Sequence, residues 1–337
     1  MVFRPVQALP VLQAVTPHAA AEHGVFTAAW YGQENMERDG MKSRKEKLLD
    51  GLDLANLVGA EIGPLHNALV KKNAGHVIYI DHTDAETLRN HYANDSKVNP
   101  ADICVDAIWG KHSLKEAIAS YYAKSGSAAQ DIDYVVASHV IEHVPDLVTW
   151  LQEIRSILKA DGQVRLAIPD KRFTFDHLRR TTHLTDVMVA YLNKARIPNT
   201  QCLLDFCLNE SLIDVATAWE GNVDPGSAKK QHTFEGALSV ARDALQNGTY
   251  HDVHCWVFTP ASFAALMGEL SRNGLVDFAC VEFFDTIHND NEFIVNLRIC
   301  DNAFDRQNSW HRMASQAQEH SRAPVVSNEP VQEVALQ

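Results

Sequence analysis

The sequence predicts an α/β fold with a mostly parallel sheet, a helical insertion after the fifth strand and a terminal antiparallel hairpin. Short apolar runs alternate with amphipathic segments over residues 54–170, the pattern of parallel strands joined by right-handed helical crossovers. Residues 173–248 show helical patterns only, so they are expected to form the insertion. Two apolar runs at 276–284 and 292–300 are joined by the polar segment 288–291, which predicts the hairpin.

Composition and charge argue against nucleic acid and a membrane span. Over 337 residues, 30 basic side chains face 43 acidic ones, for a net charge of −13. This argues against sequence-independent binding of nucleic acid, which needs a basic surface. The six cysteines include no CxxC pair, so they are interpreted as reduced thiols of a cytoplasmic protein. No apolar run approaches the roughly 20 residues of a membrane span.

The first half of the chain alternates short strands with helices after a leader without sustained periodicity. Residues 1–41 are expected to be poorly ordered or peripheral. The elements expected after them are a charged helix at 42–50, strands within 54–62, 76–80 and 103–105, and helices at 85–92 and 114–122.

The stretch 132–170 predicts a strand, a helix and a further strand. Tyr134 to Ala137 is an apolar run typical of a strand buried on both faces. Apolar residues recur at three- and four-residue steps over 147–158, which predicts one buried helix face. Residues 163–168 form the fifth strand. Ligands of open α/β sheets bind beyond the carboxyl ends of the strands, so the segments 138–143 and 170–172 are expected at that rim.

Beyond residue 172 the domain boundaries follow from the change in pattern. Residues 42–172 and 249–300 are expected to form the main domain, with 173–248 as a cap over its rim. Helices are expected near 178–194, 203–219, 234–245 and 261–271, a sheet-edge segment at 251–260, and a disordered polar tail at 301–337.

An acidic residue stands at the end of each of the first three predicted strands. Glu61, Asp81 and Asp106 would therefore line one edge of the sheet. A carboxylate after the second strand can accept hydrogen bonds from both ribose hydroxyls, and Asp106 is placed to receive an amino group such as that of adenine. For each acid, capping of the following helix is the alternative. The turn after the first strand lacks G-x-G-x-x-G, which favours a nucleoside cofactor without a bound diphosphate.

These residues resemble the successive motifs of class I methyltransferases that use S-adenosylmethionine. The resemblance is carried by EIGP at 61–64, Asp81, Asp106 and DYVVASHVIEHV at 133–144. The continuation to LAIPDKRFTFD at 166–176 resembles members associated with sugars of cell-surface polysaccharides. The resemblance implies a Rossmann-like, seven-stranded sheet with a reversed final hairpin, and S-adenosylmethionine as cofactor with S-adenosylhomocysteine as product.

The resemblance also implies which residues contact the cofactor. Glu61 and Gly63 would lie near its methionine moiety, Asp81 at the ribose and Asp106 at adenine. The full set of expected cofactor-binding residues is Glu61, Ile62, Gly63, Pro64, Asp81, His82, Asp106, Ala107 and Ser138. Leu65 and Asn67 stand where the family usually has glycines. This departure keeps open a second possibility, a non-catalytic binding protein of the same fold.

The expected reaction is O-methylation of a sugar or a similarly polar small molecule. A hydroxyl acceptor needs a base, and a histidine suits that role near neutral pH. His139 is the first candidate, His143 the second, and Glu142 is available to orient an imidazole. Stabilisation of the local turn is the alternative role for His143 and Glu142. A quinone, lipid or natural-product hydroxyl or amine is the alternative acceptor.

Acceptor binding is assigned to Asp170, Lys171, Arg172 and His254. An arginine recognises phosphate through its bidentate fork, although Lys171 and Arg172 could equally pair with surface acids.

Two patterns raise the question of a metal. His139, Glu142 and His143 spell H-x-x-E-H, the motif of inverted zincin peptidases. That motif needs a continuous helix, whereas here a strand ends just before it and Pro145 follows it. The segment His251 to His254 could also supply ligands, but packing or capping is the commoner role of such histidines. A divalent metal is compatible with these residues, but the sequence predicts none.

Overall fold

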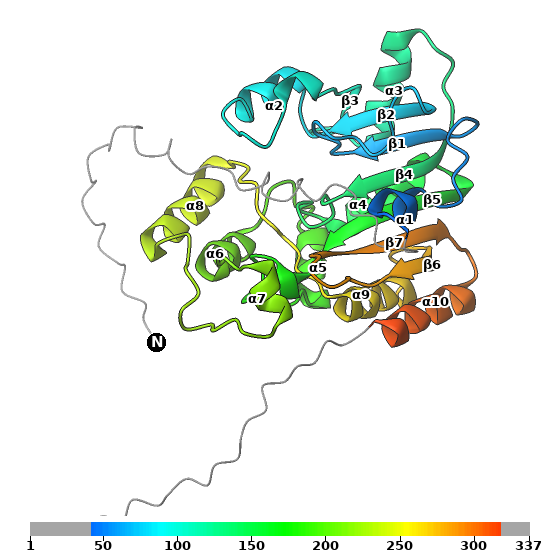
Figure 1. Ribbon diagram of the computed structural model, residues 1–337. Helices are drawn as coiled ribbons and strands as arrows, with labels where there is room; N and C mark the ends of the chain where they lie inside the picture. The colour runs from blue at the N-terminus through cyan, green and yellow to red at the C-terminus, as the bar shows by residue number, and fades with distance from the viewer. Residues whose placement is uncertain (1–41, 318–337) are drawn as a thin grey trace, which may run out of the picture.

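The computed structural model describes residues 42–317, which form a seven-stranded sheet flanked by helices (Figure 1). The strand order is β3-β2-β1-β4-β5-β7-β6. The first five strands are parallel, and β7 is antiparallel to both β5 and β6. The strands are β1 (Val58–Ile62), β2 (His76–Asp81), β3 (Ala107–Ile108), β4 (Ile132–Ser138), β5 (Leu158–Pro169), β6 (Phe278–Phe284) and β7 (Glu292–Ile299). The predicted fold class is confirmed.

Different segments cover the two faces of the sheet. One face packs on helices α3 (Leu114–Ser125), α4 (Leu147–Ile157) and α9 (Pro260–Arg272), which contribute buried residues such as Ile118, Trp150 and Phe263. On the other face, Tyr79 and Tyr134 pack against leucines of helix α1 (Arg44–Leu49) and of the loops beside β1. Both faces of the central strands are therefore buried, as their continuous apolar sequence predicts.

The register of the sheet aligns the ends of the central strands. Ile62 of β1 pairs with Ile80 of β2 and with Ala137 of β4. Ala137 in turn pairs with Leu166 of β5. The residues that follow these positions therefore emerge side by side at one edge, where ligands of open α/β sheets bind.

The third strand lies later in the chain than predicted. β3 comprises Ala107 and Ile108 instead of 103–105, because residues 100–102 form a short 3-10 turn (Pro100–Asp102) after helix α2 (Ala85–His91). Asp106 consequently precedes the strand instead of closing it, and its backbone N–H donates to the Tyr79 carbonyl at 2.8 Å.

The insertion contains four helices, α5 (Leu184–Leu192), α6 (Thr200–Asn209), α7 (Val215–Trp219) and α8 (Phe234–Asn247). The single helix expected at 203–219 is in fact two, because Ser211 forms a bridge with Lys230 and Asp214 caps a new helix. The segment 251–260 forms no regular strand either. Its one bridge joins Phe258 to Asp170.

The C-terminal region corrects another prediction. Residues 303–316, expected to be part of a disordered tail, form helix α10 (Ala303–Gln316), which packs beside α9 and β6 (Figure 1). Trp310 is buried there and donates its indole N–H to the Phe278 carbonyl at 3.0 Å. The expectations for the leader at 1–41 and for the rest of the tail at 318–337 lie outside the described residues. Within residues 42–317, no helix is long and apolar enough to cross a membrane.

Candidate active site

A large cavity opens at the edge where β1, β2 and β4 end. Its volume is about 2630 Å³. Side chains of the insertion, including Phe206 of α6 and Val240 of α8, form its outer wall, and both helices lie beyond the ends of these strands (Figure 1). Of the predicted site residues, those lining the cavity are Glu61, Ile62, Gly63, Pro64, Asp81, His82, Ser138, His139, Glu142, His143 and His254.

The turn after β1 folds tightly over Glu61. The carboxylate of Glu61 is buried and accepts the backbone N–H groups of Leu69 at 2.7 Å and Val70 at 2.9 Å. Burial raises the pKa of Glu61 to about 7. Gly63 has φ of +65°, and a Cβ at this position would lie 2.8 Å from the Val140 side chain. The two loops that follow β1 and β4 thus approach each other closely, which requires glycine here.

Leu65 adopts the backbone conformation of a glycine although it carries a large side chain. Its φ is +45°. The side chain is buried in a small cluster with Leu88, Val98 and Ile103. The turn therefore keeps a left-handed conformation at position 65 although leucine replaces the glycine usual in the family.

Asp81 and Asp106 have different environments. Asp81 ends β2 and lines the cavity, and one of its oxygens lies 2.7 Å from Nδ1 of His82. The Asp106 carboxylate instead accepts a hydrogen bond from the backbone N–H of Tyr79 at 2.7 Å and forms an ion pair with Lys72. Asp106 and Ala107, which are expected at the cofactor, do not line the cavity. The cause is the shifted strand β3, which brings Trp109 and Gly110 to the cavity instead.

His139 occupies a strained position at the end of β4. Its φ is +52°, unusual for a residue with a side chain. The ring nitrogen Nε2 lies 2.8 Å from a Glu292 oxygen. Glu292 also receives two hydrogen bonds from Arg44, at 2.6 and 2.9 Å, and Arg44 donates to the Ser138 hydroxyl. Although burial opposes its ionisation, Arg44 and His139 hold the pKa of Glu292 well below its usual range.

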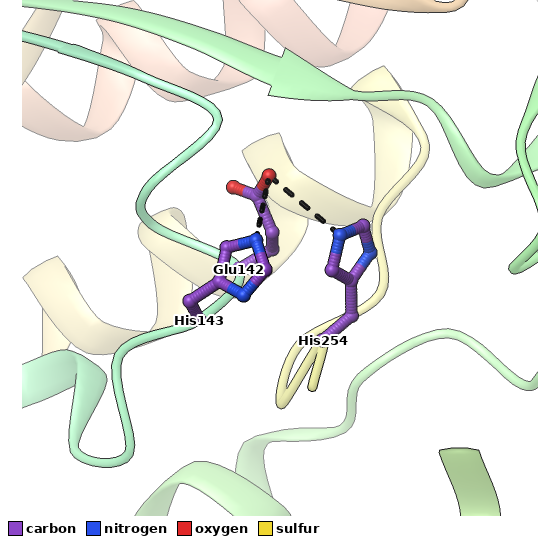
Figure 2. Close-up of side chains that lie close together, drawn as sticks. All are labelled: Glu142, His143 and His254. Carbon is purple, nitrogen blue, oxygen red and sulfur yellow. Dashed lines mark ion pairs between the residues drawn. The ribbon is translucent and has the colours of Figure 1, made fainter. Parts of the chain in front are cut away.

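Three histidines surround the buried carboxylate of Glu142. Its oxygen Oε1 lies 3.5 Å from Nδ1 of His139, 3.8 Å from Nε2 of His143 and 3.9 Å from Nε2 of His254. Figure 2 shows Glu142 with the rings of His143 and His254. Neither carboxylate oxygen of Glu142 has a hydrogen-bond partner among residues 42–317. The segment 139–144 is a turn and not a helix, as the interrupted H-x-x-E-H motif predicts.

The outer nitrogens of two of these rings bind further carboxylates. Nδ1 of His143 lies 2.9 Å from Asp252, and Nδ1 of His254 lies 2.6 Å from Asp176. Arg179 pairs with Asp176 at 2.7 Å. Burial would lower the pKa of His143, but the charge of Asp252 outweighs it and raises the pKa to about 9. Despite burial, the neighbouring cations lower the pKa values of Asp252 and Asp176 to about 2.

Three residues assigned to acceptor binding do not reach the cavity. Asp170 is fully buried and accepts hydrogen bonds from Arg172 and from the hydroxyl of Thr286. Lys171 donates to the His177 carbonyl at 2.7 Å. These contacts tie the end of β5 to the 3-10 turn Lys171–Phe173. Asp170, Lys171 and Arg172 therefore stabilise the loop after β5.

Several residues of the site have no local signal in the sequence. Arg44 stands in a run of lysines and arginines that resembles a solvated helix face, and Glu292 begins a hairpin strand. Asp176 is the last residue of the stretch 166–176, which is informative only through its resemblance. Each takes its role from a partner far away in the chain, and such pairs have no fixed spacing that a pattern could reveal.

Comparison with known proteins gives a family but no near relative. A family model described as a methyltransferase domain matches residues 58–270. No curated protein matches the chain.

Several solved structures resemble the chain at low sequence identity. A protein described as a Zn-dependent alcohol dehydrogenase from Rhodobacter sphaeroides is 13% identical, with a TM-score of 0.38 over 76% of this chain and 88% of that one. A protein described as an S-adenosylmethionine-dependent methyltransferase from Listeria monocytogenes is 9% identical, with a TM-score of 0.37 over 76% and 96%. Another methyltransferase described in the same way, from Mesorhizobium loti, is 12% identical, with a TM-score of 0.34 over 73% and 93%.

Proposed function

Because this chain belongs to the methyltransferase domain family, we propose that it transfers a methyl group from S-adenosylmethionine to an oxygen of a sugar or of a similarly polar small molecule. The proposal is carried by the position of His139. Its imidazole stands at the end of β4 in the wall of the cavity and is held there by Glu292. An imidazole fixed in this way suits a reaction in which an acceptor hydroxyl must lose its proton.

The residues at the ends of β1 and β2 fit the cofactor. The second oxygen of the Asp81 carboxylate makes no hydrogen bond or ion pair with residues 42–317, so it can accept hydrogen bonds from ribose hydroxyls. The tight turn at Gly63, with Glu61 beneath it, would hold the methionine moiety. When bound, S-adenosylmethionine supplies an electrophilic methyl group on a positively charged sulfur.

The contacts of His139 assign its two nitrogens different tasks. Nε2 faces the ionised Glu292 at 2.8 Å, so the proton of a neutral imidazole is assigned to Nε2. Nδ1 then carries the lone pair and can take the proton of the acceptor hydroxyl. Arg44 orients Glu292 through two hydrogen bonds. Arg44 and Glu292 are therefore positioning residues, and His139 is the base.

The wall of the cavity formed by the insertion supports a polar acceptor. It combines the aromatic ring of Tyr191 with charged or polar groups of Arg196, Glu210 and His232. Polar groups among aromatic side chains are the usual means of orienting a ligand with several hydroxyls. The resemblance of residues 166–176 to methyltransferases of surface-polysaccharide sugars points to the same acceptor class.

The remaining partners follow from charge and cysteine content. The net charge of −13 disfavours nucleic acid as the acceptor. None of the six cysteines forms a disulfide, which fits a protein of the reducing cytoplasm.

The proposal is tested in two steps. Calorimetry with S-adenosylmethionine and S-adenosylhomocysteine should detect one binding site, and a lack of binding at millimolar cofactor excludes the enzyme. Mass spectrometry should then detect a methylated product from a panel of free and nucleotide-linked sugars. Transfer only to quinones, lipids or amines would identify the alternative acceptors. Binding without transfer to any acceptor would favour a non-catalytic protein of this fold.

His139→Ala tests the base. We expect turnover to fall by about 10²–10⁴-fold, with the affinity for S-adenosylmethionine nearly unchanged, because the substitution removes a proton acceptor without touching Asp81 or Glu61. His311→Ala, on the exposed side of α10, is the matched control and should leave turnover unchanged. Full activity of the His139 variant would remove this residue from the role.

A further inference from the structure

Three ligand atoms converge at the inner end of the cavity. Oε1 of Glu142, Nε2 of His143 and Nε2 of His254 lie within 4.8 Å of one another. The two histidine rings are nearly perpendicular, with an interplanar angle of 89° and centroids 4.7 Å apart. Figure 2 shows both rings beside the same carboxylate, one from the turn after β4 and the other from the segment after α8. Two elements far apart in the sequence thus direct donor atoms to one point.

The carboxylate at this point makes no hydrogen bond. Glu142 is completely buried, and neither of its oxygens has a hydrogen-bond partner among the described residues. Only the rings of His139, His143 and His254 face it, at 3.5 to 3.9 Å, and burial of a carboxylate without hydrogen bonds is unfavourable. The backbone nevertheless holds it in place, because the Glu142 carbonyl accepts the N–H groups of Cys255 at 2.6 Å and Trp256 at 3.1 Å. These bonds tie the turn that carries Glu142 to the segment that carries His254.

Both histidines are oriented by outer carboxylates. Asp252 binds Nδ1 of His143 at 2.9 Å, and Asp176 binds Nδ1 of His254 at 2.6 Å. A carboxylate on one imidazole nitrogen leaves the other nitrogen to face the centre, and histidines that ligate metals usually have such a partner. The pairing occurs at both rings. In both His143 and His254, Nε2 is therefore the nitrogen that faces the centre of the cluster.

The cluster contains more carboxylates than guanidinium groups. Glu142, Asp176, Asp205 and Asp252 supply four carboxylates, and Arg179, which pairs with Asp176 at 2.7 Å and with Asp205 at 2.9 Å, supplies one guanidinium. This acidic surrounding favours a cation. A metal at this point would take the place of the proton that Asp252 favours on His143.

We propose that Glu142, His143 and His254 bind a divalent first-row transition metal, with zinc as the first candidate. Two imidazoles and one carboxylate suit zinc, iron or cobalt better than magnesium or calcium, which prefer oxygen ligands only. Three protein ligands leave at least one coordination position open, the arrangement of catalytic metal sites. All three residues line the cavity, so the open position faces the space for the acceptor. His139 is not a ligand, since its Nε2 binds Glu292.

The metal would act on the acceptor. A bound metal would lower the pKa of an acceptor hydroxyl at the open position, and Nδ1 of His139 would take the proton. The acceptor oxygen would then bond to the methyl carbon as the carbon–sulfur bond broke, which would give the methyl ether and S-adenosylhomocysteine. This role rests on the proposed function, whereas binding of the metal does not.

Metal binding is measured without reference to turnover. The full chain is stripped with a chelator, titrated with zinc by calorimetry and, in parallel, with cobalt by visible absorption, which reports the ligand geometry. We expect one metal per chain. His254→Ala should weaken binding by at least 100-fold, whereas the matched control His251→Ala should bind like the wild type, because His251 pairs with Asp243 instead.

A second variant covers the case in which His254→Ala does not fold. Asp252→Asn keeps all three ligands and removes only the orienting charge, so it should weaken binding by about 10–100-fold. Absence of stoichiometric zinc binding by the wild type, or equal affinity in the His254 and His251 variants, overturns the metal site. Calorimetry of the metal-free chain with S-adenosylmethionine separates this failure from a failure of the methyl-transfer proposal.

Discussion

At the scale of single residues, the turn after β1 retains a left-handed backbone conformation at Leu65, where the family usually has glycine. The left-handed region at Leu65, φ +45°, costs a residue with a side chain about 1–2 kcal/mol. Burial of a leucine side chain contributes about 2–3 kcal/mol. The hydrophobic contacts of Leu65 with Leu88, Val98 and Ile103 therefore offset the strain, and the turn can keep a glycine conformation without the glycine.

This balance predicts an inverted order of stability at position 65. Alanine is ordinarily more stable than glycine within a folded chain by about 0.5–1 kcal/mol. Here both Leu65→Gly and Leu65→Ala should unfold more easily than the wild type, but the glycine variant should be the more stable by about 1 kcal/mol, because it alone relieves the strain. Urea denaturation of the three proteins measures the order. A more stable alanine variant would contradict a left-handed backbone at this position.

Asp81 and Asp106 show which residue positions could be predicted from the sequence and which could not. The position of Asp81 at the end of β2 was predictable because it directly follows an apolar run whose end is unambiguous. Asp106 was misplaced because Ile103 to Val105 is as apolar as a strand, although the hydrogen bonds place β3 at Ala107 and Ile108. A two-residue edge strand carries too few side chains to show a period.

At the scale of elements, the last helix shows how burial can be hidden in a polar sequence. Most residues of α10 are polar, which led to the expectation of a disordered tail. The helix is anchored by a few residues on one face, including Trp310 and Met313, which are buried. Arg306 and Gln307 donate side-chain hydrogen bonds to Ser271 and to the Gly268 carbonyl of α9. One face of four turns is too little apolar surface to stand out by composition.

The helix predicts a sharp contrast between two adjacent residues. Trp310→Ala should lower the free energy of unfolding by about 3–5 kcal/mol, since it empties a buried site and leaves the Phe278 carbonyl without its donor. His311→Ala, one residue further on the exposed side, should change it by less than about 0.5 kcal/mol. Denaturant titration of both variants gives the comparison. Equal effects would mean that α10 contributes no core.

At the scale of the whole molecule, an early and a late segment of the described chain meet at the site. Arg44 of α1 and Glu292 of β7 are 248 positions apart, and their pairing supports His139 from the centre of the sequence. Periodicity predicted the sheet, the hairpin and the insertion, because each depends on neighbours in the sequence. It could not predict this pairing, which depends on the closed fold.

The same pairing predicts a measurable coupling. Arg44→Ala should destabilise the protein by about 3 kcal/mol, since it leaves the buried Glu292 charge with less compensation. In a Glu292→Gln background the same substitution should cost far less, so the double-mutant cycle should give a coupling of about 1–3 kcal/mol. Lys45→Ala, exposed on the same helix, is the control. Additive effects of the two substitutions would show that the pair is energetically unimportant.

The strand order has a consequence for how the protein is made. β7 lies between β5 and β6, although it is the last strand along the described residues. A chain emerging from the ribosome must therefore expose the open edge of β5 until residues 292–299 have been synthesised, and an open strand edge invites pairing with other chains. Glu292 arrives with the same strand, so His139 gains its support only then. Support of His139 and protection of the β5 edge from aggregation therefore depend on the same step, the synthesis of β7.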